Sequence, residues 1–157
     1  MANRVSAWIS IGGTVPAAIY PALVDHITAE ALSLEWDGVP FEAGDRVEGE
    51  ALKLHAHEVA GGQFEAMEAW LVDHDLPFVR WCGGYDSEWN PEIVVFTGSG
   101  DPVSYTADEQ ERVLVDRETV DRLGTIEAVR AYFKAADFTV PPLVVGGENS
   151  AVDRSAA

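Results

Sequence analysis

Cysteine is almost absent from this sequence of 157 residues, which contains only Cys82. A single cysteine excludes an internal disulfide and is typical of proteins kept in a reducing compartment. Long apolar runs are absent too. No stretch reaches the roughly 18 residues that a membrane-spanning helix needs, and the first residues contain no apolar signal region. We therefore expect a soluble cytoplasmic protein that does not bind membranes.

Positive charge is scarce, because 27 Asp and Glu residues oppose 10 Lys and Arg residues and give a net charge of -17. Residues 1–111 contain 20 acids and four bases, whereas residues 112–157 contain seven acids and six bases. Such an acidic surface repels DNA, RNA and anionic membranes and attracts basic surfaces. The charge therefore argues against direct nucleic-acid binding, although an acidic composition is also common among ordinary cytosolic proteins.

A four-residue string, Leu-Val-Asp-His, occurs twice, at residues 23–26 and 71–74. Each copy follows a pair of glycines and precedes a tryptophan at a similar offset: the pairs are Gly12-Gly13 and Gly61-Gly62, and the tryptophans are Trp36 and Trp81. We interpret this order as an internal duplication, with repeats over residues 4–37 and 51–82.

Alternating apolar and polar residues over 5–11 predict a half-buried strand. A helix is expected from about Tyr20, because Pro21 disfavours an earlier start. The same order recurs and gives the other elements of the two repeats: strands over 32–36, 52–59 and 77–82, and a helix over 63–75. The glycine- and acid-rich segment 37–50 connects the two repeats.

Two βαβ units in tandem are the ferredoxin-like arrangement, an antiparallel sheet with two helices on one face. We therefore predict the α+β class, with a duplicated ferredoxin-like core followed by a C-terminal addition over 92–145. The addition is predicted to hold strands over 92–97, 103–106 and 112–115, a turn over 121–123, and one further helix that Thr125 caps and that continues to Ala136. Residues 1–145 would form one domain, and residues 146–157 a disordered tail.

His55 and His57 are the strongest candidates for metal ligands, since they point to the same face of a strand. No third ligand is placed by spacing, so ordinary sheet-face histidines are the preferred interpretation. The Asp-His pairs of the two repeats are better explained by packing, because adjacent helical residues do not face each other. The glycine pairs match no phosphate-binding motif. We predict no catalytic residue, metal or cofactor.

The face of the sheet without helices is predicted to carry Trp8, His55, His57, Phe78 and Arg80. One functional hypothesis is therefore an enzyme or small-ligand-binding protein with a pocket at Trp8, His55, His57 and Arg80. Aromatic side chains on this face would otherwise need a cover, either residues 92–115 or a second subunit. An oligomeric accessory protein, such as a homodimer, is a further alternative.

The leading hypothesis is a non-enzymatic protein that binds a basic, nucleic-acid-binding protein. Duplex DNA presents about one negative charge per 1.7 Å of its axis, and exposed carboxylates on a small fold imitate that array. Inhibitors of restriction or CRISPR machinery are built on this logic, and the resemblance here is one of composition. The candidate contact residues are acids in three segments: Glu42, Asp45, Glu48 and Glu50; Glu65, Glu68, Asp73 and Asp75; and Asp86, Glu88 and Glu92.

Overall fold

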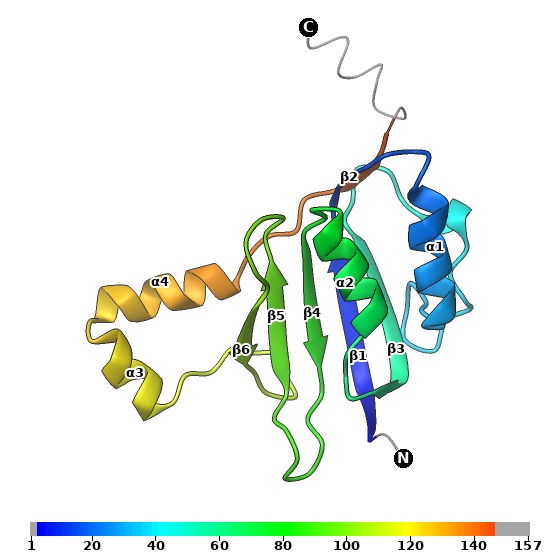
Figure 1. The fold of residues 1–157 in the computed structure, drawn as a ribbon. Coiled ribbons are helices and arrows are strands. Elements are labelled where there is room, and N and C mark those ends of the chain that lie inside the picture. The colour runs from blue at the N-terminus through cyan, green and yellow to red at the C-terminus, as the bar shows by residue number, and fades with distance from the viewer. Residues whose placement is uncertain (1–2, 147–157) are drawn as a thin grey trace, which may run out of the picture.

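The computed structural model describes residues 3–146 and has a mixed α+β fold, which confirms the predicted class (Figure 1). Its main sheet is antiparallel, with the strand order β3-β1-β4-β5-β6. These strands are β1 Arg4–Ile11, β3 Leu52–Ala60, β4 Phe78–Cys82, β5 Glu92–Phe96 and β6 Val103–Thr106. Gly146 is the first residue of the predicted disordered tail, and the rest of that tail lies outside the described residues.

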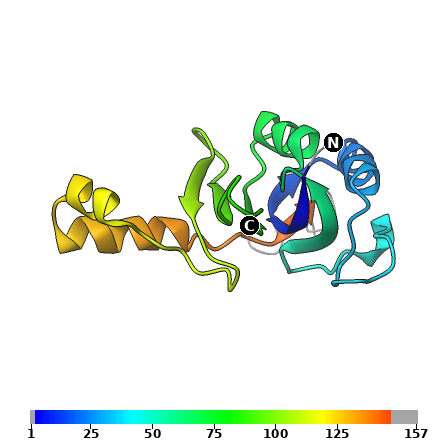
Figure 2. The same ribbon diagram turned by 90° about the horizontal axis from the view of Figure 1, so that it is seen from below.

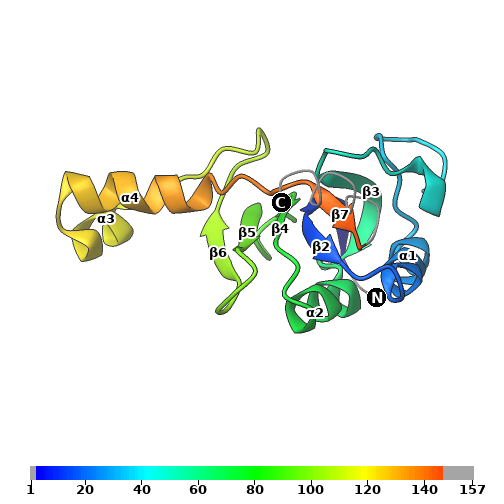
Figure 3. The ribbon, with the colours of Figure 1, turned by 90° about the horizontal axis from the view of Figure 1, so that it is seen from above.

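A second, two-stranded sheet pairs β2, Gly13–Val15, in parallel with β7, Leu143–Val145 (Figure 3). The four α-helices of the described chain are α1 Tyr20–Ala29, α2 Glu65–Asp73, α3 Arg117–Leu123 and α4 Ile126–Ala136. Helix α1 begins at the predicted residue, with a proline in its first turn. The helix α4 is capped as predicted, because the Thr125 hydroxyl accepts the backbone N–H of Ala128.

Helices α1 and α2 lie on the same side of the sheet (Figure 2). From Ala7 onward, every second residue of β1 is buried beneath them, because successive side chains of a strand point to opposite faces. The two Leu-Val-Asp-His strings contribute to this core, since Leu23 and Leu71 are fully buried and Val24 and Val72 pack against it. The prediction that the strings serve packing through Leu and Val is confirmed.

The placement of Phe78 and Arg80 on the helix-free face is wrong. Strand β1 pairs Ile9 with Arg80 and Ile11 with Phe78, so both side chains lie on the helix side of the sheet. Strand β4 is buried on both faces. Its sequence therefore shows no polar alternation that would fix which residues point to which face.

The strand predicted over 32–36 is also wrong, because only Ser33 bridges to β3, through His55. The chain turns away at Asp37, whose φ is +61°. It then returns through Phe41, whose N–H donates to the carbonyl of Leu32. Leu34 and Trp36 remain 37% exposed, so this stretch lacks the buried partner surface that a second edge strand requires.

The strand predicted over 112–115 is reduced to one bridge between Val113 and Ala107. Asp108 closes a turn here, because its carboxylate accepts the backbone N–H groups of Gln110 and Arg112. The turn predicted over 121–123 belongs to the helix α3. Its start is fixed by Asp116, which caps the helix as acceptor for the N–H of Thr119.

The helix-free face is covered in part by the chain that follows β6. A second cluster of buried side chains forms there around Trp81 and Tyr105. Its cover is supplied by Val113, Tyr132, Ala136, Phe138 and Val140. The cover lies mostly beyond the predicted segment 92–115, because β5 and β6 extend the sheet instead of crossing it. From this cover α3 and α4 extend away from the sheet (Figures 1 and 3); we call residues 116–137 the arm.

Candidate functional site

The segment between the two halves of the core, residues 34–50, combines acidic and apolar side chains on the surface; we call it the acidic loop. Its six acidic residues are all exposed: Glu35, Asp37, Glu42, Asp45, Glu48 and Glu50. Four large apolar side chains in the same segment are exposed as well: Leu34, Trp36, Val39 and Val47. Val39, at 80%, is the most exposed of them. Charged groups around apolar anchors are the composition of a protein–protein contact surface.

The acidic loop is held to the body by contacts along its whole length. Phe41 is buried in the main core with 4% of its surface exposed. The Ser33 hydroxyl donates to the Gly38 carbonyl, and the Tyr20 hydroxyl donates to the Ala43 carbonyl. A short 3-10 helix over Ala43–Asp45 is fixed by Asp45, whose carboxylate accepts the Glu42 N–H. The loop is therefore ordered before any partner binds.

The end of the acidic loop is tied to β7. The Arg46 guanidinium donates to the Leu143 carbonyl at 3.0 Å, and it lies over the ring of Tyr20 at 5.9 Å. The Leu143 N–H donates to the Glu50 carbonyl at 3.1 Å. These contacts hold the chain on both sides of Glu48 against β7.

The acids predicted as partner contacts on and after α2 do not form one exposed surface. Glu65 is exposed, but Glu68 turns inward and pairs with Arg80, so the two do not form an exposed pair along one helix face. Glu92 is paired with the same arginine. Asp73, Asp75, Asp86 and Glu88 remain exposed. Arg80 therefore withdraws Glu68 and Glu92 from the predicted contact surface.

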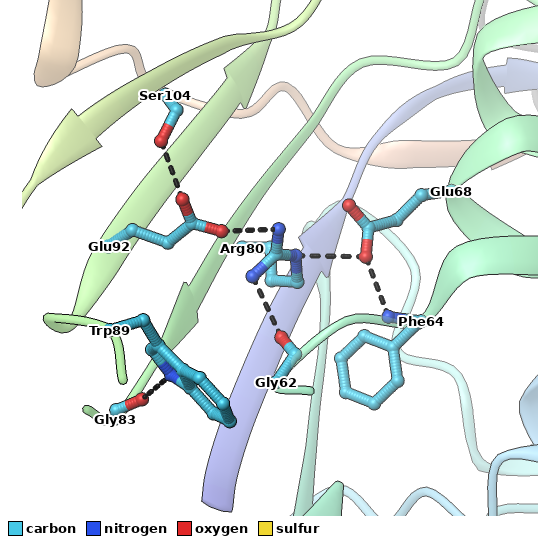
Figure 4. A network of polar contacts seen from close by, with 8 residues as sticks. All are labelled: Gly62, Phe64, Glu68, Arg80, Gly83, Trp89, Glu92 and Ser104. Atoms are coloured by element: carbon cyan, nitrogen blue, oxygen red, sulfur yellow. Dashed lines mark hydrogen bonds and ion pairs between the residues drawn. The ribbon is translucent and has the colours of Figure 1, made fainter. Parts of the chain in front are cut away.

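Arg80 is the centre of a buried polar network (Figure 4). Its Nε lies 2.8 Å from Glu68 Oε2 and its Nη2 lies 3.0 Å from Glu92 Oε1. Its Nη1 donates to the Gly62 carbonyl. The network extends to the start of α2, since Glu68 also accepts the N–H of Phe64, and to β6, since Glu92 accepts the Ser104 hydroxyl.

Burial acts to lower the pKa of Arg80, but the two carboxylates outweigh it and the pKa is raised above its usual value. A permanently charged guanidinium that contacts two carboxylates and a backbone carbonyl is a structural cross-link. Cys82, on the same strand, is 1% exposed. Burial raises the pKa of its thiol, and neighbouring Arg80 opposes this only in part, which does not favour a reactive thiolate.

The predicted pocket residues Trp8, His55 and His57 do share the helix-free face, whereas Arg80 lies on the other face. Trp36 packs against both histidine rings, with centroids 4.7 Å from His55 and 4.9 Å from His57. The ammonium group of Lys53 lies 4.1 Å from the Trp8 ring centroid, where a cation–π contact stabilises it.

His57 bridges two residues that the sequence did not single out. Its Nδ1 lies 2.9 Å from the Ser6 hydroxyl and its Nε2 lies 3.1 Å from Asp37 Oδ1. A carboxylate, an imidazole and a hydroxyl in this order can polarise the hydroxyl. The side chains of His57 and Asp37 are 47% and 83% exposed, so water screens their interaction. Ser6 meets His57 where the β1–β3 pairing shifts register between Val5 and Ala7, and the hydropathy pattern alone does not give that shift.

His26 and His74, from the two repeat strings, both lie near Trp70, with ring centroids 5.7 Å and 4.1 Å away. Within residues 3–146, no three His, Cys, Asp or Glu side chains are grouped so that they could hold a metal ion. The described helices are also too short and too polar to cross a bilayer.

The chain matches no protein-family model, and comparison with curated proteins and with solved structures gave no match either. Sequence reasoning found the acids of the loop but missed its four exposed apolar residues. The sequence could have predicted their exposure, because a glycine- and acid-rich segment is expected to lie on the surface, where large apolar residues are difficult to bury.

Proposed function

We propose that this protein is a non-enzymatic acidic protein that binds the basic surface of another protein through the acidic loop. The observation that carries the proposal is the combination of six exposed carboxylates and four exposed apolar side chains on one anchored segment. Carboxylates attract and orient a basic partner, and apolar side chains contribute binding free energy when they are buried. Because the loop is already ordered, little conformational entropy is lost on binding.

A nucleic-acid-binding protein is the partner class that this surface fits best. Sixteen of the 20 acidic side chains in residues 3–111 are exposed. Of the four bases in that segment, Arg80 is buried, Arg4 donates to the Glu58 carbonyl and Lys53 lies over Trp8. A surface that is so rich in uncompensated carboxylates presents a DNA-like field to a phosphate-binding groove. Inhibition of restriction or CRISPR machinery is the activity that such mimicry would produce.

The test is capture of the partner from cytosol at low salt, followed by elution with either a salt gradient or a short DNA duplex. Mimicry predicts that a nucleic-acid-binding protein is released by rising salt, because exposed charge contacts are screened, and also by the duplex, because both ligands occupy the same groove. A partner that the duplex does not displace would contradict mimicry. Capture of no partner would contradict the proposed function as a whole.

Matched variants separate the acidic loop from charge in general. The loop variant is Glu42→Gln, Glu48→Gln and Glu50→Gln. The control, Asp25→Asn, Glu58→Gln and Asp101→Asn, removes the same number of exposed charges outside the acidic loop and the arm. We expect the loop variant to lose affinity by at least about tenfold and the control to lose much less. Equal losses would mean that only the overall charge acts.

The apolar side chains are tested by Val39→Ser with Val47→Ser. Both residues are more than half exposed, so the free energy of unfolding should hardly change. Affinity for the partner should fall by about tenfold or more if these residues are buried in the complex. This loss of affinity should persist at high salt, unlike the loss in the loop variant, which removes charge.

The second candidate function is a hydrolytic or ligand-binding site at Ser6, His57 and Asp37. The observation that favours it is the continuous chain of polar contacts through His57, a hydrogen bond to Ser6 and a close contact with Asp37. Its test is a screen of ester substrates with the protein and with the variants Ser6→Ala and His57→Ala. This site would be favoured if both variants abolish turnover of an ester substrate and the loop variant retains it.

We also propose that residues 4–82 are a duplicated core of ferredoxin-like type. The antiparallel order β3-β1-β4 supports this, with the Ser33–His55 bridge at the position of a fourth strand. The two helices on one face and the paired Leu-Val-Asp-His strings support it further. A separately expressed fragment of residues 3–106 that unfolds cooperatively would be consistent with such a core, and a fragment without cooperative unfolding would contradict it.

A further inference from the structure

The arm carries an apolar surface that the described chain leaves uncovered. Ile126, at the start of α4, is 57% exposed, and Val120 in α3 is 40% exposed. Val129 and Phe133 continue the stripe from Ile126 at i+3 and i+7, and both are only partly buried. A shallow groove between the two helices is lined by Val120, Ile126 and Val129. Of α4, only Ala136 at its base is fully buried.

The charge of the chain restricts what can cover this stripe. Residues 3–111 carry a net charge of -16, whereas the arm holds five acids and four bases. Two copies of the protein therefore repel each other everywhere except near the arm. The arm is the part of the chain where a second copy can approach without that repulsion.

Charge is also arranged along α4 so that it complements itself. Glu127 lies near the N-terminal end, and Arg130 and Lys134 follow at i+3 and i+7. These three residues share one flank of the apolar stripe and are exposed. In an antiparallel pair of identical helices, like flanks face each other, so Glu127 of each copy meets Arg130 and Lys134 of the other.

We propose that a second copy of this chain covers the arm, with the two α4 helices antiparallel and related by a two-fold axis between Val129 and Arg130. Ile126 of one copy then lies opposite Phe133 of the other, because both are equally far from that axis. The α4 helix of 11 residues is about 16 Å long, so the acidic bodies lie at opposite ends of the pair. That separation exceeds the Debye length of about 8 Å at physiological salt.

The first test is the mass in solution, measured by sedimentation or light scattering of the full chain over a wide concentration range. We expect a monomer–dimer equilibrium that persists in salt high enough to release a basic partner from the acidic loop. The variant Val120→Ser with Ile126→Ser should weaken dimerisation by at least about tenfold. The control Val103→Ser with Leu114→Ser also replaces two exposed large apolar side chains, outside both the arm and the acidic loop, and it should leave dimerisation unchanged.

The second test is a charge exchange that reports the antiparallel pairing. Glu127→Arg alone, and Arg130→Glu with Lys134→Glu alone, should each dimerise poorly, because like charges meet. A mixture of the two variants should form a heterodimer, since opposite charges then face each other. The mixture also controls for folding, because a misfolded variant would form no heterodimer.

A chain that stays monomeric at all concentrations, or a dimer that the arm variants leave unchanged, would overturn the proposal. A dimer that needs Ile126 but does not recover in the mixture would overturn the antiparallel arrangement. Both results are measured without a bound partner, and the arm variants leave the sequence of the acidic loop intact. Failure here and failure of partner binding are therefore distinguishable.

Discussion

Arg80 and Glu68 form an ion pair that joins the centre of the sheet to the first turn of α2, with Arg80 Nε 2.8 Å from Glu68 Oε2. The arginine side chain is 3% exposed and the glutamate side chain 15%. Water therefore screens the pair only weakly. The same carboxylate accepts the Phe64 N–H, so one residue fixes both the strand and the start of the helix.

Replacing Arg80 with Ala should lower the free energy of unfolding by about 3–5 kcal/mol, because Glu68 loses its partner in a buried position. The control is Arg112→Ala, which breaks the pair with Asp108 at an arginine that is 71% exposed, and the loss there should be much smaller. Urea unfolding of both variants measures the difference. Similar losses in the two variants would show that the Arg80 network contributes no more than a surface pair.

Alanine substitutions at Gly61 and Gly62, the two glycines of the second repeat, should distinguish the cost of backbone strain from the cost of a steric collision. Both have positive φ, +63° at Gly61 and +68° at Gly62. A Cβ at Gly61 meets nothing within 4 Å, whereas one at Gly62 lies 2.8 Å from Cβ and Sγ of Cys82. We expect Gly61→Ala to cost about 1–2 kcal/mol, from the left-handed backbone alone.

Gly62→Ala should cost clearly more than Gly61→Ala, since the sulfur and the strand that carries it must move. Urea unfolding gives both values. A loss at Gly62 no larger than at Gly61 would mean that Cys82 moves without cost.

Phe41→Ala should release the acidic loop from the body. The side chain is buried in the main core, so its removal should lower the free energy of unfolding by about 3–5 kcal/mol. Limited proteolysis should then cleave within residues 34–50 before other sites. Partner affinity should fall even though every carboxylate remains, and unchanged affinity would show that order in the loop is unnecessary.

His55 should make the protein less stable in mild acid. Burial lowers the pKa of its imidazole and nearby Lys53 lowers it further, so the folded state binds this proton less readily than the unfolded state. The stability that depends on neutral His55 is complete above the unfolded pKa of about 6.5 and is lost as the pH falls through the folded pKa.

Urea unfolding at neutral and mildly acidic pH should therefore show a smaller loss in His55→Gln than in the unchanged protein. NMR titration of the ring protons should give a pKa below the usual value for histidine. A ring that titrates at or above that value would contradict the proposed role of His55 in the acid sensitivity of the fold.

The elements that the sequence predicted well are those with a clear period and a clear boundary. The strand over 5–11 alternates strictly, and the helix after Thr125 has both a cap and an apolar stripe. The repeated string Leu-Val-Asp-His also predicted its two leucines as core residues, because each copy lies within a regular helical pattern. The acidic loop was found as an acid-rich connection because charge is visible without structure.

The errors occur where one side chain or one turn decides the outcome. A strand buried on both faces gives no clue to which way Arg80 points, and its partners Glu68 and Glu92 lie 12 residues away on either side. The turn at Asp37 takes the chain away from the sheet, although the alternating pattern over 32–36 predicts a strand. The chain Ser6–His57–Asp37 depends on the strand register and on that turn, so spacing alone could not place it.

Leu143 joins the two surfaces that we propose as contact sites. It lies in β7, which follows the arm, and it is hydrogen-bonded to Arg46 and Glu50 of the acidic loop. If pairing of the arms shifts β7, the free energy of that shift links the two binding events, and thermodynamic reciprocity requires each event to change the affinity of the other equally. Under that condition, the three residues of β7 would couple self-association to partner binding.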